Sequence, residues 1–70
     1  MELIKSQITG TVFEIHVKEG DAVTSGQTVI ILESMKMEIP HEAMTSGSVK
    51  KIFVQEGDFV EEDGLLIELE

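Results

Sequence analysis

A lysine flanked by two methionines lies at the middle of this chain, in the segment Glu33-Ser34-Met35-Lys36-Met37-Glu38. The ε-amine of a lysine can form an amide with an activated acyl group, so Lys36 is a candidate attachment point for a covalently bound cofactor. The alternative is a charged residue that only keeps a turn in solvent. Because Lys36 is expected to be exposed among acidic neighbours, nothing local favours the neutral amine. Any acylation of Lys36 would therefore depend on a partner enzyme.

The position of Lys36 between two predicted strands, residues 28–33 and 38–44, indicates a hairpin turn. Two-residue hairpin turns normally contain Gly, Asn or Asp, because their central residues need positive φ. No such residue lies between Glu33 and Glu38. We therefore expect Met35 and Lys36 to adopt this geometry unaided, a kind of backbone strain that is concentrated at functional sites.

Short strands are expected along the rest of the chain, because no segment shows the 3.6-residue period of a helix. Gly20 and Gly57 supply positive φ in two Glu-Gly-Asp turns, whose aspartates can cap the turn backbone. Two-residue strands are expected after these turns. Pro40 cannot donate a hydrogen bond to a sheet, so it should lie on an edge strand or at a bulge. The main strands are predicted at residues 2–7, 11–17, 28–33, 38–44, 48–54 and 65–69.

The chain contains an internal repeat with a constant offset. Gly20 corresponds to Gly57 and Leu32 to Leu69, and the members of both pairs are 37 positions apart (57 − 20 and 69 − 32). The half-repeats cover about residues 9–33 and 46–70, within one predicted domain of residues 1–70. The duplication predicts two similar halves packed about a pseudo-twofold axis, because neither half can bury its apolar face alone.

The repeat also predicts which side chains face the core. Ile31 corresponds to Glu68, which is expensive to bury, so Ile31 is expected on the outer face despite its apolar neighbours. The apolar positions change parity in the middle of the second strand of each half. Since strand side chains alternate with a period of two, a bulge is predicted near Phe13-Glu14 and near Lys50-Lys51.

The composition restricts the classes of function. The 70-residue chain carries 14 acidic and 5 basic residues, a formal net charge of −9. This charge argues against binding to nucleic acid or to anionic membranes, and for either simple solubility or docking on a basic protein surface. The chain has no cysteine and no signal-peptide pattern, which fits a reducing cytoplasm. We expect a cytoplasmic monomer.

Other reactive side chains form no recognisable catalytic site. His16 and His41 lack the further ligands that a metal site needs, and are expected to be on the surface or half-buried. Met44 and Phe59 are expected in the core, and Ser34 at the edge of the turn rather than as a nucleophile. No Ser/His/Asp set, metal cluster or phosphate-binding glycine loop is evident, so the chain is predicted not to be an enzyme.

The chain resembles the biotinyl/lipoyl attachment domains, and within them the small biotin carriers of biotin-dependent carboxylases. Glu33-Ser34-Met35-Lys36-Met37 is similar to the attachment motif of that family, and both halves contain its Gly-x-Val and Val-x-x-Gly-Asp-x-Val segments. The resemblance covers nearly the whole chain. It implies an all-β fold, a flattened β-barrel or sandwich of two four-stranded antiparallel sheets with pseudo-twofold symmetry, and an exposed Lys36 hairpin opposite the termini.

The same resemblance implies a carrier function. A biotin protein ligase would join biotin to Lys36 from biotinyl-adenylate, and the arm would carry carboxybiotin between biotin carboxylase and carboxyltransferase components. Met35 and Met37 would serve recognition by these partners or pack against the sheets. Glu33 and Glu38 are candidates for ligase docking, or are simply solvated.

Two alternatives and three local departures accompany the resemblance. In the first alternative Lys36 carries lipoate, although the turn of lipoyl domains usually contains Asp-Lys-Ala. In the second the chain is a structural β domain without any modification. A proline of the family is replaced by Ile8-Thr9, and the protruding thumb of some biotin carriers is absent. Asp63-Gly64 stands where the repeat predicts a glycine opposite Gly26, which suggests that this turn is rebuilt.

Overall fold

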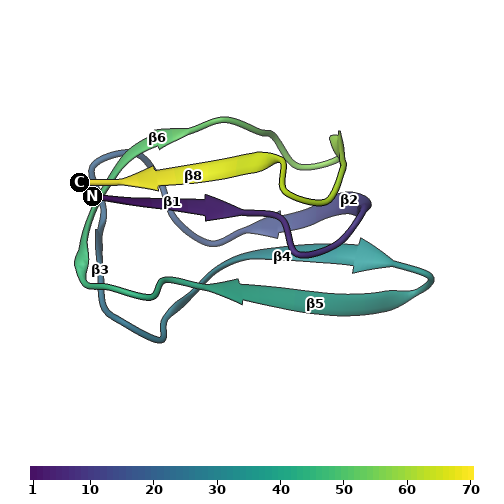
Figure 1. Cartoon of the computed structure of the whole chain (residues 1–70), viewed down its shortest axis with the longest axis horizontal. Coiled ribbons are helices and arrows are strands. Elements are labelled where there is room, and N and C mark those ends of the chain that lie inside the picture. Colours follow the sequence, from purple (N-terminus) through teal and green to yellow (C-terminus); the bar gives the residue numbers. More distant parts are fainter.

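The computed structural model describes all 70 residues and contains eight strands and no helix (Figure 1). There is accordingly no helix long and apolar enough to cross a membrane. The strands are β1 (Glu2–Lys5), β2 (Gly10–Ile15), β3 (Ala22–Val23), β4 (Thr28–Ser34), β5 (Met37–Glu42), β6 (Gly47–Ile52), β7 (Phe59–Val60) and β8 (Leu65–Leu69).

The strands form two antiparallel four-stranded sheets, which confirms the predicted fold. The first sheet has the order β1-β8-β6-β3, and the second has the order β5-β4-β2-β7. Strands β1, β8, β6 and β3 of the first sheet correspond in the repeat to β5, β4, β2 and β7 of the second, in the same order. The two sheets are therefore related by the duplication. The β4–β5 hairpin and the two termini lie at opposite ends of the molecule (Figure 1).

The predicted irregularities of the strands are present. The pairing of β2 with β4 shifts register between Val12 and Glu14, and the pairing of β6 with β8 shifts between Val49 and Lys51. Pro40 lies on β5, an edge strand, where the sheet needs no donor from its nitrogen. These features confirm the bulges and the edge position that the sequence predicts.

Hydrogen bonds between the halves follow the repeat. The N–H of Ile15 donates to Oε2 of Glu56 over 3.0 Å, and the N–H of Ile52 donates to Oε2 of Glu19 over 3.2 Å. Each half therefore ties down a strand of the other half through a glutamate at the equivalent position. This reciprocity explains why both Glu-Gly-Asp turns retain their glutamate.

The two Glu-Gly-Asp turns have the predicted geometry. Gly20 and Gly57 have φ values of 94° and 96°, which side chains rarely permit. Asp21 and Asp58 each accept a 2.9 Å hydrogen bond from the backbone N–H three residues earlier. The aspartates therefore cap the turns, as the sequence indicates.

The turn at Asp63 is not rebuilt, so that prediction is wrong. Asp63 has φ 70° and Gly26 has φ 88°, and their N–H groups donate over 2.7 Å to Ser6 O and Ala43 O respectively. The backbone is therefore the same in both halves. The physical reason is that Asp, with its short polar side chain, tolerates the left-handed region better than most residues do.

Thirteen apolar side chains form one core between the sheets. Ile30 and Leu32 are fully buried, whereas Ile31 is only partly buried on the outer side, as the repeat predicts. The core residues are Ile4, Val12, Val17, Val23, Val29, Ile30, Leu32, Ala43, Val49, Val60, Leu66, Ile67 and Leu69.

Three predicted placements are wrong. Met44 and Phe59 are 77% and 69% exposed rather than in the core, whereas His41 is only 2% exposed rather than at the surface or half-buried. Strand side chains alternate between faces. Val60 therefore takes the inward position next to Phe59, and Ala43 the one next to Met44. His41 points inward from β5, as does Ala43 just after this strand, and His41 occupies the position that Ile4 has in the other half.

Candidate attachment site on the β4–β5 hairpin

The tip of the β4–β5 hairpin is a tight turn with an unfavourable backbone. Ser34 pairs with Met37 across the two strands, which leaves Met35 and Lys36 as the central residues. Their φ values are 53° and 65°, so both are in the left-handed region without being Gly, Asn or Asp. L-residues pay roughly 1–2 kcal/mol each in this region. The predicted strain is therefore present at the two residues that the sequence singled out.

Lys36 differs from Lys50 and Lys51 in having no charged or aromatic partner, and from Lys5 and Lys18 in its place on the strained turn. It is exposed at the turn, and neither of the two ion pairs in the protein involves it. Lys50, by contrast, lies 3.9 Å from Glu68, and Lys51 stands over the ring of Phe53 at 5.2 Å from its centroid. The amine of Lys36 is thus held away from the body of the molecule, where a second protein can reach it.

The methionines beside Lys36 point into solvent. Met35 is 92% exposed and Met37 is 63% exposed. Neither belongs to the core cluster or to the side chains packed against it. Of the two roles considered for these residues, packing against the sheets is therefore unsupported, and availability to a partner is favoured.

One row of side chains crosses the second sheet just below the hairpin. Phe59 of β7 pairs with Thr11 of β2, Thr11 pairs with Glu33 of β4, and Glu33 pairs with Glu38 of β5. All four residues are exposed. The row therefore places an exposed aromatic ring and two carboxylates on the face that leads to Lys36. The sequence analysis did not predict Phe59 at this surface. The inward position of its neighbour Val60 could have indicated it, because adjacent strand residues face opposite sides.

The two sheets share a backbone design but differ in charge. The strands of the first sheet carry three lysines and two glutamates, a balance of 3 − 2 = +1, and those of the second sheet carry four glutamates and no lysine or arginine, a balance of −4. The duplication alone would give equal charges. The negative field is thus concentrated on the sheet that bears the hairpin. Its glutamates are Glu14, Glu33, Glu38 and Glu42.

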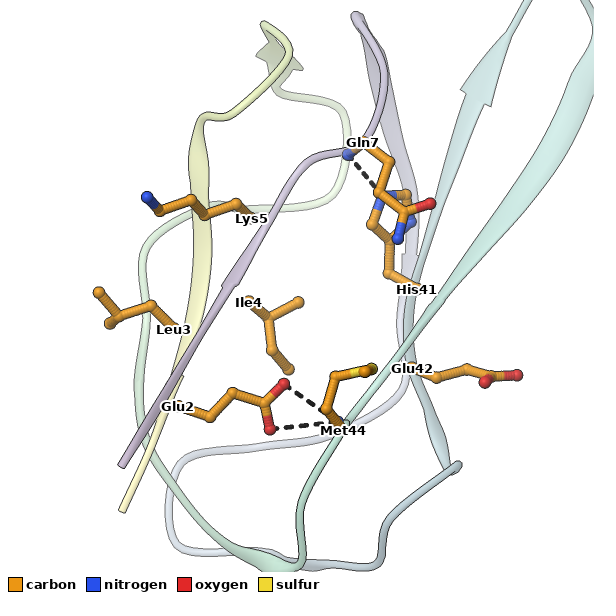
Figure 2. Close-up of a pocket in the computed structure, with 8 residues that line it drawn as sticks. All are labelled: Glu2, Leu3, Ile4, Lys5, Gln7, His41, Glu42 and Met44. Carbon is orange, nitrogen blue, oxygen red and sulfur yellow. Dashed lines mark hydrogen bonds between the residues drawn. The ribbon is translucent and has the colours of Figure 1, made fainter.

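A small groove of about 120 Å³ lies between the edge strands β1 and β5 (Figure 2). Ile4 points into it, whereas Leu3 and Lys5 project from the other side of β1. The groove is smaller than the roughly 300–1,000 Å³ of typical small-molecule sites. No group of His, Asp and Glu side chains is arranged to hold a metal ion. The groove therefore offers no second site for a cofactor.

His41 has a structural role in this seam. Its Nε2 accepts a 2.9 Å hydrogen bond from the N–H of Gln7, and its Nδ1 lies 3.2 Å from Ile39 O, to which it can donate (Figure 2 shows the bond to Gln7). This arrangement requires the neutral ring. Burial lowers the pKa of His41 below 6.5, and the hydrogen bond to Ile39 opposes this shift in part. His41 thus ties β5 to the loop after β1.

Comparisons with known proteins agree with this geometry. A family model described as "Biotin-requiring enzyme" matches residues 2–69. The chain is 52% identical over 66 residues to a biotin/lipoyl attachment protein of Bacillus subtilis, a match that covers 94% of this chain and 90% of that protein.

Two solved structures have the same fold. The chain superposes on the urea carboxylase of Kluyveromyces lactis with a TM-score of 0.91 and 40% identity, over 97% of this chain but only 6% of the carboxylase. It superposes on the lipoyl domain of the 2-oxoglutarate dehydrogenase complex of Azotobacter vinelandii with a TM-score of 0.77 and 32% identity, over 89% and 78% of the two chains.

Proposed function

The chain belongs to the biotin/lipoyl attachment family and is a carrier of covalently bound biotin rather than an enzyme, and from this premise we propose that Lys36 is the attachment residue. The observation that carries the proposal is the position of Lys36, an exposed and unpaired lysine on a strained turn at the end of the molecule opposite the termini. If the turn served only the stability of the fold, Gly or Asn would be expected at these positions.

The attachment would form one amide bond. The ε-ammonium of Lys36 gives up two protons in all, its nitrogen attacks the acyl carbon of biotinyl-adenylate, and AMP leaves. Because the surroundings of Lys36 contain no base aimed at its nitrogen, a biotin protein ligase would supply both the activated acyl group and the proton acceptor. The free amine at the turn fits this role, since no side chain of the protein has to move to expose it.

Attached biotin supplies a ring that can be carboxylated and can pass the carboxyl group on. The arm between the backbone of Lys36 and that ring would be on the order of 14 Å at bond lengths near 1.5 Å. The domain holds the arm at one end and presents it at a high effective concentration, as a tethered module does. A homologous domain occurs within a carboxylase, which supports biotin carboxylase and carboxyltransferase components as the partners.

The ligase would recognise the outer face of the second sheet. Its strands carry a balance of −4, and its exposed row ends at Glu33 and Glu38 beside the hairpin. A partner with a basic surface would be steered toward this sheet and not toward the first one. Phe59 in the same row offers an apolar contact.

The direct test is incubation of the purified protein with a biotin protein ligase, biotin and ATP, followed by intact mass measurement. The mass is expected to rise by one biotinyl group. Lys36→Arg keeps the charge but offers no acylable amine at this position, so it should gain nothing, whereas Lys51→Arg on the first sheet should behave as the parent protein does. Labelling of Lys36→Arg to the same extent as the parent would refute the assignment.

Lipoate on Lys36 is the second candidate, because a lipoyl domain superposes on this chain over 78% of that domain's length. A parallel incubation with a lipoate ligase, lipoate and ATP separates the two. Biotin carriage predicts modification by the biotin ligase and little by the lipoate ligase, and the reverse result would favour lipoate. The monomeric state and the cytoplasmic location stay predictions.

A further inference from the structure

All four methionines of the protein lie outside its core. Met1, Met35, Met37 and Met44 are 89%, 92%, 63% and 77% exposed, and none is among the 13 core residues. This is unusual, because the flexible thioether commonly fills irregular gaps in cores. Two of the four flank Lys36. The other two are near the opposite end of the molecule, Met1 at the N-terminus and Met44 in the loop after β5 (Figures 1 and 2).

The fold gains little from the two methionines beside Lys36. Met35 contributes no core contact and has an unfavourable φ of 53°, so its presence at this position destabilises the free protein. Met37 is largely exposed at the first position of β5. A chemical change confined to these two side chains would therefore leave the folded structure intact and alter only the surface that a partner meets.

We propose that Met35 and Met37 are reversible oxidation sites that control whether Lys36 can be modified. This inference rests on the proposed attachment function. Hydrogen peroxide transfers one oxygen atom to each sulfur. The O–O bond breaks, the thioether loses two electrons to become a sulfoxide, and each molecule of hydrogen peroxide is reduced to water. A thiol-dependent sulfoxide reductase reverses the step, returning the thioether and water while two thiols become a disulfide.

Oxidation changes the recognition surface in a defined way. The sulfoxide is polar and hydrogen-bonding, whereas the thioether is apolar and adapts its shape to different partners. A ligase pocket that buries Met35 or Met37 would have to desolvate the new S–O group without a matched donor. Docking on the acidic row of Glu33 and Glu38 would be unaffected, so the loss should appear as weaker binding and not as a changed salt dependence.

The test compares three proteins before and after treatment with hydrogen peroxide, which is removed by catalase before ligase is added. They are the parent, the double variant Met35→Leu/Met37→Leu, which stays apolar but is not oxidisable at these positions, and the matched control Met44→Leu. Peptide masses report which methionines carry oxygen. Initial rates of biotinylation at low carrier concentration report the effect, and thermal unfolding followed by circular dichroism reports the state of the fold.

The expected result is a fall in rate of about tenfold or more for the oxidised parent and the oxidised Met44→Leu protein, since burial of one such side chain is worth at least that factor. The rate of the double variant should not respond to peroxide, the unfolding temperatures should not change, and methionine sulfoxide reductase should restore the parent. An unchanged rate for protein oxidised at both positions would overturn the inference, as would equal slowing of the double variant. Failure of the untreated parent to accept biotin would instead overturn the attachment proposal on which the inference rests.

Discussion

Glu33 and Glu38 lie directly opposite each other on β4 and β5, one pair below the Ser34–Met37 pair that closes the hairpin. Like charges in direct opposition destabilise a sheet. Neither carboxylate takes part in an ion pair that would offset the repulsion. Together with the left-handed turn above it, this pair makes the hairpin less stable than its pairing alone would allow, which is expected where a surface is kept for a partner.

Removal of either charge should therefore stabilise the protein. Glu33→Gln and Glu38→Gln are each expected to raise the free energy of unfolding by about 0.2–1 kcal/mol, measured by urea denaturation at low salt. The same variants should raise the KM for biotinylation, since the ligase would lose an acidic contact. Glu42→Gln is the control, because Glu42 faces Thr28 and not a charge. Stabilisation by Glu42→Gln as large as that of the other two variants would argue against a specific repulsion.

The strain at the turn makes a second prediction. Met35→Asn should raise the free energy of unfolding by about 0.5–1 kcal/mol, because Asn tolerates positive φ better than Met does. Met37→Asn should give no such gain, because Met37 is in a regular strand. If both variants change stability equally, the φ of Met35 is not the source of the strain.

Gly10 and Gly47 occupy equivalent positions, and each lies against a carbonyl oxygen of another segment of the backbone. A Cβ at Gly10 would collide with the carbonyl oxygen of Glu33, and a Cβ at Gly47 would collide with that of Glu70. Glu33 is paired on both sides, with β2 and with β5, whereas Glu70 lies beyond the end of β8 and is hydrogen-bonded on one side only, to Ser48. Gly10→Ala should therefore destabilise the protein by about 1–3 kcal/mol in urea denaturation, and Gly47→Ala by less. Equal losses would contradict this difference in restraint.

The buried His41 should make stability depend on pH. Burial lowers its pKa in the folded protein below the unfolded value of 6.5. Above pH 6.5 the ring is neutral in both states. As the pH falls below 6.5, the unfolded chain takes up a proton that the folded protein resists, so stability decreases until the folded pKa is reached. The free energy of unfolding should thus decrease from pH 7.5 toward pH 5.5.

The control for this pH dependence is the other histidine. His16→Gln should keep the decrease between pH 7.5 and 5.5, whereas His41→Gln should lose most of it while remaining less stable overall, because Gln7 loses its acceptor. Urea denaturation at several pH values measures both. A decrease that survives His41→Gln would place its origin in other groups.

The fold was predictable because the duplication makes its main features visible twice. Both bulges follow from a change of parity that occurs in each half, and the outward position of Ile31 follows from its partner Glu68. The strained hairpin followed from the absence of Gly, Asn and Asp between Glu33 and Glu38. These predictions used local rules that tertiary packing had no reason to override.

The errors arose where the halves have diverged. His41 occupies the position of the core residue Ile4, but the half-repeats identified in the sequence, residues 9–33 and 46–70, do not include this pair, and the acceptor role of its Nε2 depends on the distant Gln7. Met44 and Phe59 were placed in the core on residue type alone, although their neighbours Ala43 and Val60 hold the inward positions. The charge difference between the two sheets required the strand order, which the sequence does not supply.

If Lys36 is the attachment residue, biotin should be carried on Lys36 and on no other lysine. The most direct measurement is peptide mapping by mass spectrometry of the protein purified from cells supplied with both biotin and lipoate. A biotinyl group is expected on the peptide that contains Lys36, and no adduct is expected on peptides that contain Lys5, Lys18, Lys50 or Lys51. A lipoyl group on Lys36, or biotin on any other lysine, would contradict it.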